Sequence, residues 1–117
     1  MIPSLNSTLS ALQTYKKSVG VTANNIANVN TEEFKKSRAT MKEGVNGNVE
    51  VEIKKVITPG HRYQVHEGHQ MVEKETSNVN LEEELPDLMI TQRTYEANLK
   101  VLQTQDKMLG ATLDILG

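Results

Sequence analysis

The stretch that decides the fold is TANNIANVNTEEFKK, residues 22–36, where an apolar helical repeat ends in a cluster of asparagines. Asn24, Asn25, Asn28 and Asn30 fall within seven residues. Asn side chains satisfy backbone groups that are freed where a helix ends, and Asn tolerates left-handed backbone angles at the exit. We therefore predict that a helix ends within this stretch and that the chain turns there.

The segment before the asparagines carries apolar residues in steps of three and four. The repeat runs over more than three heptads and has one polar break, Lys16. Its members are Ile2, Leu5, Leu9, Leu12, Lys16, Val19, Ala23 and Ile26. This spacing predicts one helix with a coiled-coil seam. Lys16 can keep its aliphatic stem on the seam and its ammonium group in water.

The last third of the chain shows two heptad positions. One is apolar throughout: Leu81, Leu88, Tyr95, Leu102, Leu109 and Leu116. The other is Leu85, Gln92, Leu99, Asp106 and Leu113. The polar members Gln92 and Asp106 allow two interpretations. They fix the register or oligomer state at a cost in stability, or they tolerate exposure in a loosely packed seam.

The start of this second helix is marked by Asn80 and Glu83, which resemble a capping box. Carboxylates at Glu82–Glu84 suit the positive end of the helix dipole, and this explains them better than an acid–base site does. Pro86 cannot donate a backbone hydrogen bond, so we expect a kink or a restart near Leu85.

The middle of the chain predicts β-structure. In NGNVEVEIKKVI, residues 46–57, apolar and charged side chains alternate as in a half-buried strand. A turn signal at Thr58–Gly60 and a second short alternation in HRYQVHEG follow. We predict one β-hairpin over about 49–66, which must pack on something because two strands alone are marginal in water. Residues 67–77 are polar, and we expect them to be extended or mobile.

The predicted fold is mainly α, with the N- and C-terminal helices paired as an antiparallel coiled coil and a small β-hairpin insert between them. The segments are 1–36, 37–76 and 77–117. Two helices with unfilled apolar seams should pair, and each well-buried Leu contributes about 1.5–3 kcal/mol. The predicted seam joins Leu5, Leu9, Leu12, Val19 and Ile26 to Leu88, Tyr95, Leu99, Leu102 and Leu109.

Composition argues against several function classes. The chain has 117 residues, a net charge of −2 and no cysteine, so a basic nucleic-acid surface and thiol chemistry are not expected. No apolar run approaches the roughly 20 residues that span a bilayer, and the N-terminus lacks the features of a cleaved signal peptide. His61, His66 and His69 match no metal motif, and no phosphate loop or nucleophile–base pattern is present. We expect no catalytic or metal site, no cofactor and no small-molecule substrate.

The asparagine-rich stretch resembles the N-terminal signature of bacterial flagellar axial proteins, which comprise rod, hook and hook-associated proteins. That signature reads roughly A-N-N-[IVL]-A-N-x-x-T-x-G-[FY]-[KR]. The matching residues are Ala23, Asn24, Asn25, Ile26, Ala27, Asn28, Thr31, Phe34 and Lys35. Glu33 stands where the family usually has Gly, a residue that adopts positive φ freely. Residues 77–115 resemble the family's C-terminal segment.

The resemblance implies a structural protein rather than an enzyme. Family members leave the cell through the flagellar export apparatus without a cleaved signal and polymerise into a tube through their terminal helices. The short insert is most like that of a proximal-rod component. We therefore expect a self-assembling subunit of the periplasmic rod of the basal body, with itself, other rod proteins and the export apparatus as partners. The alternative hypothesis is a divergent soluble paralogue, a regulator or adaptor that binds a partner helix through the same seam.

Overall fold

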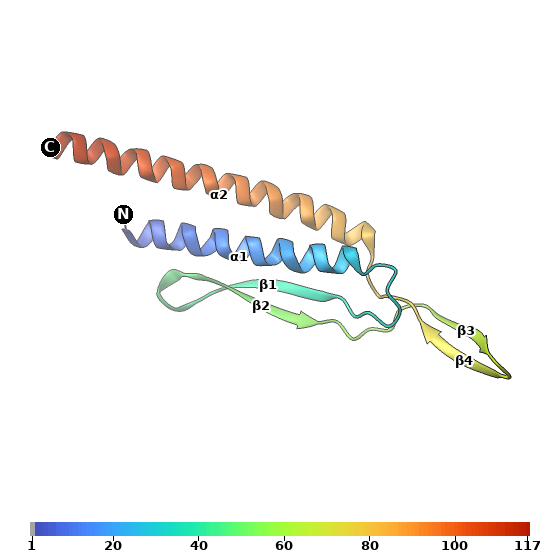
Figure 1. Ribbon diagram of the computed structural model, residues 1–117. Coiled ribbons are helices and arrows are strands. Elements are labelled where there is room, and N and C mark those ends of the chain that lie inside the picture. The colour runs from blue at the N-terminus through green and yellow to red at the C-terminus, as the bar shows by residue number, and fades with distance from the viewer. Residues whose placement is uncertain (1) are drawn as a thin grey trace.

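The computed structural model describes the backbone of residues 2–117 and the side chains of residues 5–117. Met1, part of the predicted first segment, and the side chain of Ile2, the first member of the predicted repeat, lie outside them. The elements in chain order are α1 (Ile2–Ala27), β1 (Ser37–Glu43), the 3-10 turn η1 (Val45–Gly47), β2 (Val49–Lys55), β3 (Arg62–Glu67), β4 (Gln70–Glu75) and α2 (Leu81–Leu116). The protein is elongated, with extents of 83 × 25 × 18 Å (Figure 1). Helix α1 ends inside the asparagine-rich stretch, as predicted.

The two helices lie side by side and run in opposite directions (Figure 1). Near one end, the Thr8 hydroxyl lies 3.1 Å from Oε1 of Gln105. Near the other end, the Asn25 amide donates to the Glu84 carboxylate over 3.3 Å. Helix α1 also packs against β1 and β2, where the Thr14 hydroxyl donates to a backbone carbonyl of β2. It therefore lies between α2 on one side and a β-hairpin on the other.

The strands form two separate antiparallel hairpins. Strand β1 pairs with β2, so that Ala39 lies opposite Ile53, and β3 pairs with β4, so that Val65 lies opposite Val72. The β3–β4 hairpin turns at Gly68, which has a φ of 65°. This hairpin projects beyond the helices at one end of the molecule (Figure 1).

The predicted sheet is therefore wrong. Strands exist at 49–55 and 62–67, but the predicted 49–66 hairpin does not, because each strand pairs with a different partner. The segment expected to be extended or mobile contains β4. The missed strand β1, SRATMKE, carries few apolar residues because only alternate side chains face α1. The chain thus has more β-structure than a mainly α fold with one insert.

The predicted coiled-coil pairing is also wrong. Among the described side chains, the buried apolar residues are Ala11, Leu12 and Val79, whereas the buried polar residues are Thr8, Thr14, Thr22, Asn25, Lys36, Ser77 and Glu84. The less exposed positions of α2 include a heptad that alternates polar and apolar side chains: Glu84, Leu88, Thr91, Tyr95, Asn98, Leu102, Gln105 and Leu109. We call this set the inner heptad. Helix α1 divides its buried surface between α2 and the β1–β2 hairpin. Only part of its apolar repeat therefore faces α2, and the two helices meet through hydrogen-bonded polar pairs as well as apolar contacts.

The start of α2 also differs from expectation. The Asn80 side chain makes no capping bond; instead its backbone carbonyl accepts from the N–H groups of Glu83 and Glu84. The helix runs through Pro86 without a restart. Proline at this position removes only the bond to the Glu82 carbonyl, which lies in the first turn. The acidic residues do occupy that first turn, as predicted.

Candidate assembly interface

Asn25 joins three elements of the fold. Its side chain is 1% exposed. Its Oδ1 accepts from the Ser37 N–H at 3.0 Å, and its Nδ2 donates to the Ser37 carbonyl at 2.8 Å and to Glu84 Oε2 at 3.3 Å. The amide thus pairs with the first residue of β1 as a neighbouring strand would. We call Asn25, Ser37 and Glu84 the Asn25 junction; it ties the end of α1 to the starts of β1 and α2.

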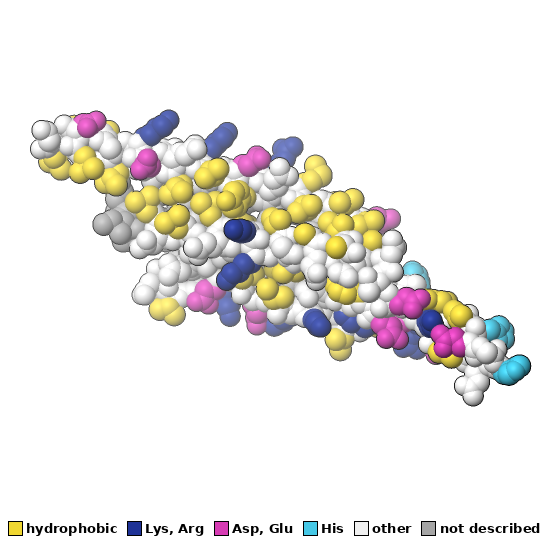
Figure 2. All heavy atoms as spheres, in the orientation of Figure 1, with side chains coloured by type: hydrophobic (Ala, Val, Ile, Leu, Met, Phe, Trp, Pro, Cys, Tyr) yellow, Lys and Arg dark blue, Asp and Glu magenta, His cyan; other side chains and the backbone are white. Residues whose placement is uncertain are grey.

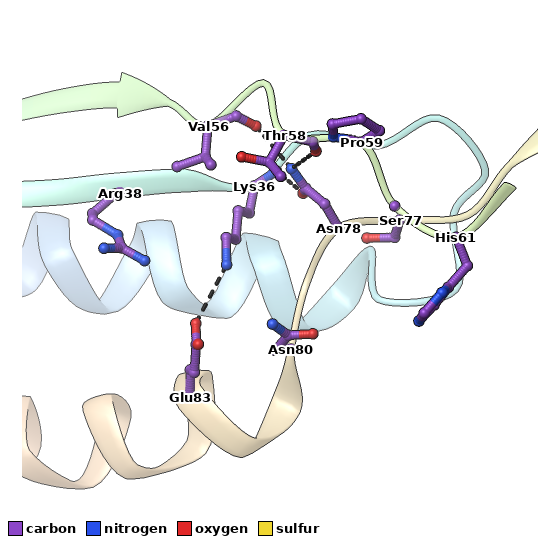
Figure 3. Close-up of a pocket in the computed structure, with 11 residues that line it drawn as sticks. Lys36, Arg38, Val56, Thr58, Pro59, His61, Ser77, Asn78, Asn80 and Glu83 are labelled. Atoms are coloured by element: carbon purple, nitrogen blue, oxygen red, sulfur yellow. Dashed lines mark hydrogen bonds and ion pairs between the residues drawn. The ribbon is translucent and has the colours of Figure 1, made fainter.

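A second asparagine ties the loops beside this junction. Asn78 accepts from the Lys36 N–H at 2.7 Å and donates to the carbonyls of Val56 and Thr58, both at 2.8 Å. The buried Lys36 side chain reaches Glu83 of α2 at 3.3 Å (Figure 3). These residues border a cleft of about 440 Å³. Asn78 and Lys36 therefore tie together the segments that lead into β1, leave β2 and lead into α2.

The signature loop turns on short-range hydrogen bonds. The Asn28 amide donates to the Asn24 carbonyl at 2.8 Å, and the Thr31 hydroxyl to Asn28 Oδ1 at 3.0 Å. Phe34 is half-buried, and its backbone carbonyl accepts from the Asn78 N–H. The loop is thus joined to the segment that leads into α2.

Glu33 occupies the left-handed region, with a φ of 61°. Its N–H donates to the Glu75 carbonyl at 2.9 Å, which joins the loop to the end of β4. This conformation is sterically unfavourable for a residue with a Cβ, whereas Gly adopts it freely. The position where the family signature has Gly therefore retains the backbone shape that Gly would favour.

Charged contacts join the same loop to the β3–β4 hairpin. The Lys35 ammonium pairs with the Glu75 carboxylate, and the Gly60 N–H donates to the same oxygen at 2.9 Å. These two bonds lower the pKa of Glu75. The Tyr63 hydroxyl bonds Glu32, which raises the pKa of Tyr63, and Lys74 bonds Glu67, which raises the pKa of Lys74. The base of the hairpin is thus anchored mainly by polar contacts.

Much of the predicted seam is accessible to solvent. Leu12 is buried, but Leu9 is 45% exposed and Leu99 is 38% exposed. The remaining seam residues are partly exposed: Leu5, Val19, Ile26, Leu88, Tyr95, Leu102 and Leu109. The other heptad position of α2, which we call the outer heptad, consists of Leu85, Gln92, Leu99, Asp106 and Leu113, all exposed. Apolar side chains consequently gather along both helices on one face of the molecule (Figure 2).

A groove of about 310 Å³ runs between the helices on this face. It is lined by Val19 and Lys16 of α1 and by Leu88, Gln92 and Tyr95 of α2. Two of the polar residues that interrupt the sequence repeats, Lys16 and Gln92, thus meet in one apolar groove. Its walls suit a side of another helix better than a small polar ligand.

Within residues 5–117, no three His, Asp or Glu side chains are grouped so that they could hold a metal ion. Neither α1 nor α2, over the described part of the chain, has the length and apolarity needed to cross a membrane.

Comparison with known proteins agrees with the signature residues. A family profile for flagella basal body rod proteins matches residues 5–35, and one for the C-terminal part of flagellar basal body rod FlgEFG proteins matches residues 70–115. The chain belongs to the flagellar basal-body rod protein family. The two matched segments of this rod-family chain contain most of α1, β4, most of α2 and two residues of the junction, Asn25 and Glu84.

Individual rod-family relatives are matched over a short region. Flagellar basal-body rod protein FlgG of Buchnera aphidicola subsp. Acyrthosiphon pisum is 57% identical over 35 residues, which is 30% of this chain and 14% of the relative. FlgG of Borreliella burgdorferi is 50% identical over 36 residues, 31% of this chain and 14% of the relative. The match spans only a small part of each relative's length.

Sequence reasoning identified the signature asparagines but missed their partners. Glu84 resembles any carboxylate in a first helical turn, and nothing in the sequence indicates that it is buried against Asn25. Lys36 likewise resembles a solvated residue within EEFKKSR. Glu84 is buried against the Asn25 amide, and the Lys36 ammonium pairs with the Glu83 carboxylate. Both pairings join residues that only the tertiary structure brings together.

Proposed function

We propose that this chain is a structural subunit of the flagellar basal-body rod, which assembles with copies of itself and with other rod proteins through α1 and α2. Membership of the rod family supports a structural role in the basal body. The mechanism is packing: apolar helix surface that the single chain leaves exposed is buried against neighbouring subunits. The predicted seam and signature-loop residues are the proposed contact and positioning residues.

The exposed apolar face of the two helices carries this proposal. Leu85 is 49% exposed, Met89 58% and Leu113 59%. All three lie on α2, which has 36 residues, and the single chain leaves them uncovered. Exposed apolar residues that gather on one face of a molecule mark interaction surfaces. Burying apolar area contributes about 25 cal/mol per Å², so several such residues per neighbour supply a large share of an assembly energy.

Location and export belong to the same proposal. A rod subunit acts in the periplasmic part of the basal body, and it reaches that site through the flagellar export apparatus. The departures from the family pattern do not prevent the family fold, since Glu33 adopts the required backbone angle and α2 continues through Pro86. Both observations support a rod subunit over a divergent adaptor.

Mass spectrometry of basal bodies purified from cells that express the chain tests this role. We expect several copies per basal body for the wild type and loss of the chain from basal bodies for Leu99→Glu. Lys100→Glu, a charge change at the neighbouring exposed position, is the matched control and should remain incorporated. Recovery of the wild-type chain only in a discrete soluble complex would instead support the adaptor hypothesis.

A further inference from the structure

Two charges of opposite sign interrupt the apolar repeats on the exposed face. On α1, Lys16 lies at seven-residue steps from Leu9 and Ala23. On α2, Asp106 lies at the same steps from Leu99 and Leu113 in the outer heptad. Neither Lys16 nor Asp106 forms an ion pair within residues 5–117.

The two charges cannot meet within one chain. Lys16 lines the groove beside Gln92, and Asp106 follows Gln92 by two heptads along α2. At 1.5 Å per residue, this separation is about 21 Å along the helix. A lysine side chain cannot cover that distance, so a pairing requires a second molecule.

We propose that α2 of a second copy docks in the groove between α1 and α2, so that its Asp106 pairs with Lys16. This inference rests on the proposed self-assembly and specifies its register. The second copy would be displaced along the helix axis by about 21 Å relative to the first. Because this displacement is a whole number of heptads, Leu113 of the second copy faces the level of Leu9 and its Leu99 faces the level of Ala23.

Charge complementarity selects this occupant and this register. The outer heptad contains one carboxylate, Asp106, and the groove contains one ammonium, Lys16. Leucines alone repeat every seven residues and would allow docking at any whole-heptad displacement. A charged group enclosed in an apolar groove is strongly disfavoured unless an opposite charge is beside it. A polar pair at one heptad level is a recognised means of fixing the register of packed helices.

Charge reversal in the purified full chain tests the pairing. Lys16→Glu and Asp106→Lys should each raise the critical concentration for assembly about tenfold, measured by sedimentation and electron microscopy. The double variant Lys16→Glu/Asp106→Lys should assemble close to the wild-type concentration. Lys17→Glu is the control, because Lys17 lines a different groove, beside Ser10 and Val49. Circular dichroism of each variant at low concentration checks that the fold is intact.

Crosslinking gives a second readout that does not depend on the size of the assembly defect. The chain has no cysteine, so single-cysteine variants are unambiguous. A mixture of Lys16→Cys and Asp106→Cys chains should form a disulfide-linked heterodimer on oxidation of the assembly. A mixture of Lys17→Cys and Asp106→Cys chains should not, since Lys17 lines a different groove and side chains that point apart cannot form a disulfide.

The outcomes separate this inference from the proposed function. If the wild type assembles but neither reversal weakens assembly, or the double variant fails to recover, the Lys16–Asp106 register is wrong and self-assembly stands. If the wild-type chain forms no assembly alone and no crosslink, the occupant is not a second copy, and both the register and homopolymeric assembly are overturned. Incorporation into basal bodies would then point to another rod protein in the groove.

Discussion

Replacement of Asn25 by Ala should destabilise the whole chain, because the Asn25 junction joins three elements through one side chain. The change removes the hydrogen bonds to the Ser37 N–H, the Ser37 carbonyl and the Glu84 carboxylate. It leaves these groups without their partner at a site that is 1% exposed at Asn25 and 8% exposed at Glu84. Each bond contributes about 0.5–1.5 kcal/mol, and each buried group left unsatisfied costs about 1–3 kcal/mol.

Allowing for partial access of water, we expect a loss of about 3–5 kcal/mol in the free energy of unfolding. Urea denaturation followed by circular dichroism at low protein concentration measures this loss. With a urea slope of about 2 kcal/mol per M, the unfolding midpoint should fall by about 2 M. Asn24→Ala is the matched control; Asn24 is exposed, so its change should be below about 0.5 kcal/mol.

Asn25→Asp sharpens the same test. Asp keeps an oxygen for the Ser37 N–H but loses the donor to Glu84 and adds a second carboxylate beside it. We expect a loss at neutral pH at least as large as that of Asn25→Ala, with partial recovery on acidification as one carboxyl becomes protonated. A midpoint for Asn25→Ala within about 0.5 M of the wild type would refute the reasoning that this amide holds the junction together.

Three further predictions concern the loop, a close backbone approach and the hairpin base. Glu33→Gly should be more stable than Glu33→Ala by about 1 kcal/mol in urea denaturation, because only Gly adopts a φ of 61° without strain; equal stabilities would contradict this. Gly60→Ala should cost about 1–3 kcal/mol in thermal unfolding, since a Cβ there collides with the backbone of the segment after β4, whereas Gly20→Ala, in open space on a helix, should gain about 0.5–1 kcal/mol. The pKa of Glu75 is lowered in the folded chain, so its contacts to Lys35 and the Gly60 N–H stabilise the fold fully above about pH 4.5. This stabilisation is lost as the pH falls through the lowered pKa of the folded state. Acid titration followed by NMR should show the loss, and Glu75→Gln should remove this contribution to the pH dependence of stability.

The helices were predictable because their signals are local and long. A repeat of apolar residues over several heptads identifies α1 and α2 without knowledge of what they contact, and the asparagines identify where α1 ends. The strands at 49–55 and 62–67 were visible for the same reason, since alternation is a local property. The partner of each strand was not, because register and pairing depend on segments distant in sequence.

The candidate interface was predictable only in part. The heptads located the apolar residues, but the sequence does not distinguish a position that faces the other helix from one that faces a neighbouring molecule. Leu102 and Leu99 illustrate this, since both are apolar heptad residues, yet Leu102 belongs to the less exposed inner heptad and Leu99 to the exposed outer heptad. The role of Asn25 was hidden because its partners Ser37 and Glu84 are brought together by the tertiary fold alone.

The alternation of polar and apolar residues in the inner heptad affects whether α2 can shift along α1. If α2 moved by seven residues along α1, its leucines would remain in phase, but Asn25 would face Thr91 instead of Glu84, and Thr8 would lose Gln105. Specific hydrogen bonds therefore hold the inner side of α2 at one position along α1. Among the described side chains, no hydrogen bond fixes the outer heptad in the same way. The inner side of α2 therefore has its register set within the chain, whereas the register of its outer side would be set by contacts with a neighbouring molecule.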